Sequence, residues 1–490
     1  MQTFLWHDYE TWGVDPRRDR PAQFAAIRTD SDLNPVGDPL MIYAKPPRDC
    51  LVQPDAVMVT GITPQHAELH GVSERDFIAR IHKEMMQHET CSVGYNSLRF
   101  DDEVTRNTLY RNFYDPYERE YKNGNSRWDL IDVVRLCYAL RPEGVEWPKD
   151  AMGNPSFRLE NLTEANGIEQ QGAHDALVDV RATIDVAKKI KTLHPKLFDY
   201  ALSLRNKHEV TKRLRVGSFT PVFHVSSMFG GANHCCSVVL PIAFSQVNRN
   251  EVICIDLRKD PSDLLALDGE MLRIRQFGTS EQLADLAKSE GVEAIERLPI
   301  KNIHINKCPM ITPVSMLQPD DCERLNLGVS DIKKHREMIM QDHTLVQKLL
   351  ALFQANDSHE SIADPDCMIY SGGFFSDYDK SLMGELRRSE PKALIDGSFA
   401  FTDVRLPEML NRYLARNYHE LLEGEALVKW QAFCRKRILE EGAGSTIALE
   451  AFNLRLAELE GEYAGSGEKR SLIAALADWR DQLIESVGGE

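Results

Sequence analysis

Three short acidic motifs do most to limit what this chain can fold into. They lie at residues 7–11 (HDYET), 95–102 (YNSLRFDD) and 174–179 (HDALVD). The first lies on an apolar segment with strand character, and the other two lie where helices are expected to begin. Together they supply four carboxylates and a histidine, in an order suited to holding two Mg²⁺ ions. The fold must therefore bring three distant parts of the chain to one point.

Asp8 and Glu10 are two residues apart on a predicted strand, so both side chains should point to the same face. Two carboxylates on one face repel each other unless a cation lies between them. The alternative for this fragment alone is a strand end that enters a turn.

Asp101 opens a predicted helix over residues 100–111, where the helix dipole favours an acid in the first turn. A capping role is therefore the alternative to a metal-holding role. Asp102 and Glu103 fit the same pattern equally well, so spacing alone leaves the choice among the three acids open.

His174 and Asp179 are five residues apart, which would place them on different faces of one continuous helix. We therefore expect His174 just before a helix, Asp175 near its cap and Asp179 inside it. A histidine titrates near neutrality and suits a general base beside metal-holding acids. The alternative is a capped surface helix with a solvated histidine.

Bulk composition limits the class of protein. The chain has 490 residues, too many for one ordinary core, with 42% hydrophobic and 27% charged residues, as in a soluble globular protein. It contains no run of about 18 apolar residues, and its N-terminus lacks the basic region of a signal peptide. Ten scattered cysteines without a CxxC pair indicate neither a zinc site nor a disulfide framework. We therefore expect a cytoplasmic protein with no membrane association.

The formal net charge of −17 argues by itself against a nucleic-acid binder. Binding, however, depends on local charge, and basic residues gather at 205–215. An acidic body with a positive surface region is compatible with this distribution.

The order of predicted elements divides the chain into three domains. Strands come first and then alternate with helices, which predicts a mixed sheet flanked by helices over residues 1–195. Short β-rich runs with helical insertions near 260–290 predict a small β domain over 196–345. Helical periodicity predicts a helical domain over 346–490. Helices of the first domain are predicted at 73–86, 100–111, 127–140, 156–166 and 174–192.

The acidic motifs are part of a longer resemblance. The chain resembles the exonuclease I family of bacterial DNA exonucleases, within the superfamily of 3′→5′ exonucleases that use four acids and a histidine. The stretches that carry the resemblance are HDYETWG at 7–13, DRPAQFAAIRTD at 19–30, GITP at 61–64, GYNSLRFDDEVTRN at 94–107, RNFYDPY at 111–117, SRWDLIDV at 126–133, ALRPEG at 139–144, PSFRLENLTEANGI at 155–168, AHDALVDV at 173–180, RNKH at 205–208, NRN at 248–250, HINKCP at 304–309, GGFFSD at 372–377 and YLARNY at 413–418.

The resemblance implies an α/β fold, with an RNase H-like exonuclease domain followed by an SH3-like β domain and a C-terminal all-helical domain. In this family the three domains clamp single-stranded DNA in a groove. Two Mg²⁺ ions are the implied cofactor, with Mn²⁺ as an alternative. By matching motifs, His174 becomes the general base, and the metal-holding acids become Asp8, Glu10, Asp101 and Asp179.

The resemblance also implies contacts with the DNA substrate, through cations and aromatic rings that suit single-strand binding. The alternative for each is a solvated charge or a packing residue. Tyr121 departs mildly from the family, which can carry a larger aromatic there. The implied contacts are Glu10, Thr11, Arg106, Tyr117, Tyr121, Arg135, Arg158, Lys207, Asn250 and Asn306.

A protein partner is implied as well, namely the acidic C-terminal tail of single-stranded DNA-binding protein. Arg141 and Tyr200 lie in matching stretches and are expected to contribute to its pocket. Thr220 stands where the family can carry a lysine, so we expect a contact of modest strength.

The sequence therefore predicts a monomeric, Mg²⁺-dependent exodeoxyribonuclease that degrades single-stranded DNA from the 3′ end. It would release 5′-mononucleotides and act in recombination and mismatch repair. One alternative is an exoribonuclease of the same chemistry, distinguished by its tolerance of a 2′-hydroxyl near the metals. Another is a non-catalytic single-stranded DNA-binding protein, which would normally have lost at least one of the five site residues.

Overall fold

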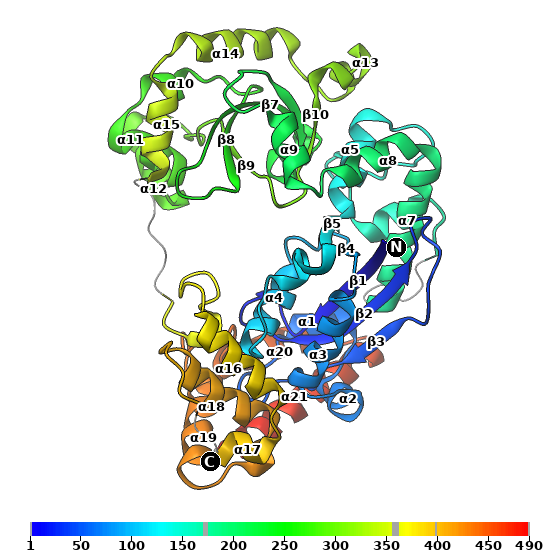
Figure 1. Cartoon of the computed structure of the whole chain (residues 1–490), viewed down its shortest axis with the longest axis vertical. Helices are drawn as coiled ribbons and strands as arrows, with labels where there is room; N and C mark the ends of the chain where they lie inside the picture. Colours follow the sequence, from blue (N-terminus) through cyan, green and yellow to red (C-terminus); the bar gives the residue numbers. More distant parts are fainter. Residues whose placement is uncertain (1, 170–174, 355–361, 397–398, 489–490) are drawn as a thin grey trace. The chain divides into compact units, whose positions relative to one another are not determined.

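The computed structural model describes residues 2–169, 175–354, 362–396 and 399–488 (Figure 1). The chain forms two compact units. The first unit is assembled from three separate stretches of chain, and the second from two. The first contains residues 1–127, 170–184 and 360–490, and the second contains residues 128–169 and 185–359.

A five-stranded mixed sheet with the strand order β3-β2-β1-β4-β5 carries the first acidic motif. The central strand β1 (Thr3–Thr11) pairs antiparallel with β2 (Pro21–Thr29) and parallel with β4 (Thr90–Gly94). The outer strands are β3 (Leu40–Tyr43) and β5 (Ser126–Asp129). Most residues of β1 and β2 are buried on both faces, as expected of strands that are covered by helices.

Helices cover the sheet and complete its core. α3 (Glu74–Met85) begins after Ser73, whose side chain accepts the N–H of Asp76. It buries Phe77 against Tyr9 of β1. The other elements of the first unit here are α1 (Pro54–Thr60), α2 (Pro64–His70), α4 (Asp101–Arg111), the first half of α7 (Ala176–Leu193) and the 3₁₀ turns η1 (Glu118–Glu120) and η2 (Lys122–Gly124). The helices α5 (Leu130–Leu140) and α6 (Leu159–Ala165) belong to the second unit.

The second unit contains an antiparallel sheet with the strand order β10-β6-β7-β8-β9. Helices α10 to α12 lie between β8 and β9 in sequence, which confirms the predicted helical insertions. The strands are β6 (Val222–Val225), β7 (Cys236–Phe244), β8 (Glu251–Asp256), β9 (Ile300–His304) and β10 (Met310–Pro313). The helices are α8 (Pro195–Ser203), α9 (Lys207–Leu214), α10 (Ser262–Ala266), α11 (Gly269–Phe277), α12 (Ser280–Glu290), α13 (Pro319–Arg324), α14 (Val329–Gln341) and α15 (Leu345–Gln354).

The remaining helices belong to the first unit and share a core with its N-terminal part. Trp12 and Val57 are buried in one apolar cluster with Phe452, Leu476 and Trp479. In Figure 1, α1 lies beside α20 and α21 and contacts both, and α2 contacts α21. The C-terminal helices are α16 (Asp377–Arg388), α17 (Pro391–Asp396), α18 (Leu406–Asn417), α19 (Gly424–Leu439), α20 (Leu449–Glu462) and α21 (Gly467–Ser486).

Buried ion pairs also join the two parts of the first unit. Asp49 is paired with Arg20 at 3.2 Å and also lies beside Arg437 of α19. Burial alone would raise the pKa of Glu74, but Arg111 and Arg20 lower it to about 2. These arginines are thus committed to compensating buried acids.

One predicted element is wrong. Residues 127–140 do not form a single helix, because β5 occupies the first three of them and α5 begins at Leu130. Arg127 forms an ion pair with Asp102. The indole N–H of the fully buried Trp128 donates to the carbonyl of Ala201. These two contacts accompany the extended backbone of β5. Asp129 then caps α5 by accepting the N–H of Ile131.

None of the helices within the described residues is long and apolar enough to cross a membrane.

Candidate active site

β1 presents Asp8 and Glu10 together because the residue between them is anchored elsewhere. Tyr9 is buried and packs on Phe24 with ring centroids 4.7 Å apart. Its hydroxyl accepts a hydrogen bond from Thr105 Oγ1 at 3.0 Å. Because side chains alternate along a strand, the flanking acids share the other face, where both are half-buried.

Asp101 is held by β1 just beyond the point where β1 and β4 stop pairing. β4 pairs with β1 only as far as Trp6, and beyond it the N–H of Tyr9 donates to Asp101 Oδ1 at 3.1 Å. Gly94 allows the chain to turn here, since a Cβ would lie 2.9 Å from the carbonyl oxygen of His7 and 2.6 Å from Ser97 Cβ. A backbone donor of the central strand therefore holds this carboxylate in place.

The next acid of α4 has a different environment. Asp102 accepts bonds from Arg119 at 2.6 Å and from Arg127 at 2.7 Å. Although burial opposes ionisation, these arginines hold the pKa of Asp102 well below its usual range. Asp102 is therefore a structural anion, whereas Asp101 exerts its charge on the acids of β1.

Glu103 is engaged in a separate network around a predicted DNA contact. It accepts from Arg106 Nη1 at 2.6 Å and also from the hydroxyl of Tyr370. Arg106 donates through Nε and Nη2 to Glu120 at 2.7 and 3.0 Å. Its guanidinium lies over the ring of Tyr117 at 5.3 Å. Of the three acids considered from the sequence, only Asp101 lies beside the acids of β1.

The start of α7 is set by two polar side chains. The buried Gln23 of β2 accepts the N–H of Ala176 with Oε1 at 3.1 Å. Asp175 accepts the N–H of Leu177 at 2.9 Å, which confirms its predicted place near the cap. Asp179 follows one turn later, on the part of α7 that belongs to the first unit.

Asp8, Glu10 and Asp179 converge. One carboxylate oxygen from each lies within 4.8 Å of the others, and no other such acid or histidine group exists within the described residues. Burial, followed by repulsion from Asp101, Glu10 and Asp179, raises the pKa of Asp8 well above its usual value. Burial, followed by repulsion from Asp179, Asp101 and Asp175, raises the pKa of Glu10 to about 9. A divalent cation would offset this repulsion, so the donor set fits a metal site.

His174, the predicted general base, lies outside the described residues. The residue after it, Asp175, is described and caps α7. Sequence reasoning missed Gln23 as a residue that positions α7. Its signal was a single amide in the otherwise apolar segment PAQFAAI of β2.

The other predicted DNA contacts of the first unit differ in exposure. Thr11 is buried after a register shift in β1, and its hydroxyl donates to the carbonyl of Gly13 at 2.6 Å. Tyr117 is half-buried beneath the Arg106 guanidinium. Tyr121 is 62% exposed, so its ring is available to a ligand.

The predicted contacts of the second unit form two close groups and one separate cation. Arg135 is buried, and its guanidinium lies over the ring of Phe157 at 5.7 Å. Phe157 is followed in sequence by Arg158, which is exposed. The backbone carbonyl of Asn250 accepts the N–H of Ile305 at 2.8 Å, which brings Asn250 near Asn306 at one end of the β8–β9 pair. Lys207 is exposed at the first position of α9.

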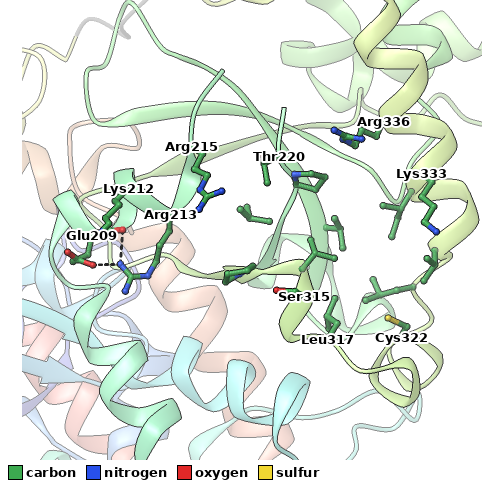
Figure 2. A pocket seen from close by; sticks show the side chains of 18 residues that line it. Glu209, Lys212, Arg213, Arg215, Thr220, Ser315, Leu317, Cys322, Lys333 and Arg336 are labelled. Atoms are coloured by element: carbon green, nitrogen blue, oxygen red, sulfur yellow. Dashed lines mark hydrogen bonds and ion pairs between the residues drawn. The ribbon is translucent and has the colours of Figure 1, made fainter. Parts of the chain in front are cut away.

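One of the predicted partner residues, Tyr200, lies against the lining of a cavity of about 780 Å³ (Figure 2). Thr220 lines it, together with apolar side chains of β6, β7, β10 and α14. Arg213 also lines it, lies over the ring of Tyr200 at 5.1 Å and forms an ion pair with Glu209. Arg141 is not among the lining residues. Further cations of the lining are Lys212, Arg215, Lys333 and Arg336.

Comparison with known proteins identifies the domains of the chain. The model of the "Exonuclease" family matches residues 5–187, that of the "Exonuclease I SH3-like domain" matches 205–355, and that of the "Exonuclease I C-terminal domain" matches 363–483. Exodeoxyribonuclease I of Escherichia coli (strain K12) is 43% identical over 484 residues, which cover 99% of this chain and 98% of the relative.

The chain belongs to the exonuclease I family. A solved exonuclease I from Methylocaldum szegediense shares 44% identity with a TM-score of 0.92, over 99% of this chain and 100% of that one. The zinc-bound E. coli exonuclease I complex with single-stranded DNA shares 42% identity with a TM-score of 0.91, over the same proportions. The predicted family and the predicted order of domains are confirmed, while the boundaries at residues 195 and 345 stay predictions.

The raised pKa of Glu10 gives this exonuclease I family member a testable dependence of stability on pH. Between the unfolded value of 4.5 and the folded value of about 9, the native state holds a proton that the unfolded state has lost. The free energy of unfolding of the metal-free protein should therefore fall as pH rises, by at most about 1.4 kcal/mol per pH unit from this group. Denaturant unfolding in EDTA measures it.

Glu10→Gln is the matched control, because the amide keeps the shape and removes the titration. The stability of the variant should depend less on pH, and added divalent metal should stabilise the wild type most at high pH. Equal slopes for the two proteins would contradict the assignment of this titration to Glu10.

Proposed function

We propose that the chain is a Mg²⁺-dependent exodeoxyribonuclease that degrades single-stranded DNA from the 3′ end and releases 5′-mononucleotides. The observation that carries this proposal is the convergence of Asp8, Glu10 and Asp179. It is supported by a relative named exodeoxyribonuclease I that matches 99% of the chain. Mg²⁺ prefers carboxylate oxygens and keeps several waters, which suits this donor set.

Each residue of the site has a role in this proposal. Bound divalent ions supply activation of a water and stabilisation of the leaving 3′ oxygen. Asp8, Glu10, Asp101 and Asp179 hold the ions, and Asp101 is itself fixed by the N–H of Tyr9. His174 accepts the proton of the attacking water on a ring nitrogen. All four acids belong to one unit of one chain, which supports the proposal that the enzyme acts as a monomer.

The proposed substrate contacts divide into two kinds. Tyr121, Arg158 and Lys207 are exposed and suited to direct stacking or phosphate contact. Arg106 and Arg135 are buried, and each lies over an aromatic ring. We assign these two arginines to holding those rings in place. We assign Thr11, beside Glu10 on β1, to contact with the terminal nucleotide. We assign Asn250 and Asn306 to the contacts that the β domain makes with the DNA.

The proposed activity suits recombination and mismatch repair, in which single strands with 3′ ends are removed. End-labelled DNA and RNA, incubated with Mg²⁺ or with EDTA, separate it from the alternatives. An exoribonuclease would degrade the RNA, and a non-catalytic binding protein would degrade neither.

Asp8→Ala tests the metal site. Cleavage of end-labelled single-stranded DNA should be abolished, because one of three converging carboxylates is lost. Binding of the same DNA should remain largely intact, because phosphate contacts elsewhere supply most of the affinity. Turnover near that of the wild type would contradict the assignment of Asp8 to a metal site.

Asp102→Asn is the matched control in the adjacent helix. It leaves Arg119 and Arg127 without their shared anion, so it should lower the free energy of unfolding by about 3–5 kcal/mol. Under conditions where it remains folded, it should keep bound metal, whereas Asp101→Asn should lose metal affinity. The opposite pattern would exchange the roles of the two acids.

His174→Ala tests the general base. The rate should fall by roughly 10²- to 10⁴-fold, the usual contribution of a positioned base. Metal binding, measured by calorimetry, should persist because the carboxylates remain. If it disappears with the imidazole, His174 is a ligand and the base must be sought elsewhere.

A second proposed ligand is the acidic C-terminal tail of single-stranded DNA-binding protein. The support is the cavity of Figure 2, where apolar side chains lie between Arg213 and Arg215 at one side and Arg336 at the other. A tail with apolar side chains and a terminal carboxylate complements such a lining. Thr220 brings no charge, so the affinity should be modest.

A peptide ending in acidic and apolar residues with a free carboxylate should bind the wild type, more weakly as salt is added. Arg141→Ala should weaken it, as the resemblance implies. Arg215→Ala tests the cavity independently. Unchanged affinity in Arg141→Ala with a loss in Arg215→Ala would keep the site in the cavity and remove Arg141 from it. Unchanged affinity in both variants would contradict the proposed site.

A further inference from the structure

Two histidines lie together on the surface of α2. His66 and His70 are both exposed, and the centroids of their rings are 4.5 Å apart. They are four residues apart in sequence, so the helix places them on one face, one turn from each other. Two imidazoles that share one ion at a Zn–N distance of about 2.1 Å have ring centroids on the order of 5 Å apart. The two rings therefore already lie near the separation that a shared ion requires.

The helix that carries these rings is anchored at its start and along one side. Thr63 caps α2 by accepting the N–H of His66 with its hydroxyl oxygen at 3.2 Å. Ala67 is buried, and the side chain of Gln65 donates to the carbonyl of Ala475 in α21 at 2.7 Å. The backbone that bears the two histidines is therefore fixed by the rest of the first unit.

One of the two imidazoles is held further by a tyrosine of β3. The ring of Tyr43 meets the ring of His66 edge-on, with centroids 5.0 Å apart. The hydroxyl of Tyr43 accepts a hydrogen bond from Gln23 Nε2 at 3.0 Å, which fixes the tyrosine in turn. Glu68 stands between the two histidines in sequence, and its Oε1 accepts from Arg48 at 3.0 Å. The imidazole of His66 is therefore already oriented, and the acid on the same helix is engaged by a cation.

We propose that His66 and His70 bind one divalent ion of the zinc, copper and nickel group, through one nitrogen of each ring, with water completing the coordination. Imidazole nitrogen suits these metals, whereas Mg²⁺ prefers oxygen. Two histidines four residues apart on one helix face is also the spacing with which helices hold zinc in metalloproteases. The inference does not rest on the proposed function, because α2 carries none of the residues assigned to catalysis or DNA binding.

Calorimetric titration of Zn²⁺ into the whole protein, in saturating Mg²⁺, tests this site. His66→Gln and His70→Gln should each weaken Zn²⁺ binding by more than about tenfold, because loss of a ligand costs at least as much as loss of a residue that supports one. The matched control is His88→Gln, which removes an exposed histidine that has no histidine four positions before or after it, and which should keep the affinity of the wild type. Equal affinities for the wild type and both α2 variants would overturn the proposal.

Asp8→Ala separates this site from the acid cluster. Zn²⁺ binding that depends on His66 should persist in Asp8→Ala, because the two sites share no ligand. Electron paramagnetic resonance of Cu²⁺ bound to Asp8→Ala should show two nitrogen ligands, and His70→Gln in the same background should remove one of them. Coordination by oxygen alone would overturn the proposal. Zn²⁺ binding that is lost in Asp8→Ala and kept in His70→Gln would likewise overturn it, because the ion would then lie at the acids.

Discussion

Repulsion among carboxylates at one point is the constraint on which the rest of this structure depends. Asp8, Glu10 and Asp179 are brought together, and burial makes the charges of Asp8 and Glu10 costlier. The surrounding contacts must therefore hold the acids against their own repulsion. A strand N–H holds Asp101, and a buried amide holds the start of α7. The N–H of Tyr9 and the amide of Gln23 belong to β1 and β2, which pair with each other.

Arginines near this region form ion pairs with other acids. Arg119 and Arg127 neutralise Asp102, one residue from Asp101 in sequence. Arg20 and Arg111 similarly compensate Glu74. Asp101 and Asp102 are adjacent in the chain but have different electrostatic environments. Asp101 lies beside other acids, whereas Asp102 is paired with two arginines. The whole-chain charge of −17 conceals this division.

The sequence predicted well those features that depend on neighbours along the chain. The strand that bears Asp8 and Glu10, and the cap at Asp175, follow from local spacing, and both are present. Features that depend on distant partners were less accessible. The environment of Asp102 depends on arginines at positions 119 and 127, and the extended backbone at β5 depends on the burial of Trp128. The identities of these residues do not reveal their partners, so periodicity extended α5 too far.

The first unit has a consequence for the order in which the protein acquires activity during synthesis. Its core joins Trp12 to Phe452 and Trp479, and its ion pairs join Asp49 to Arg437. A ribosome releases the chain from the N-terminus, so these contacts form only after nearly all residues have emerged. A truncated nascent chain therefore lacks the contacts that Trp12 and Asp49 make with the C-terminal helices. The first unit can be completed only after those helices have emerged.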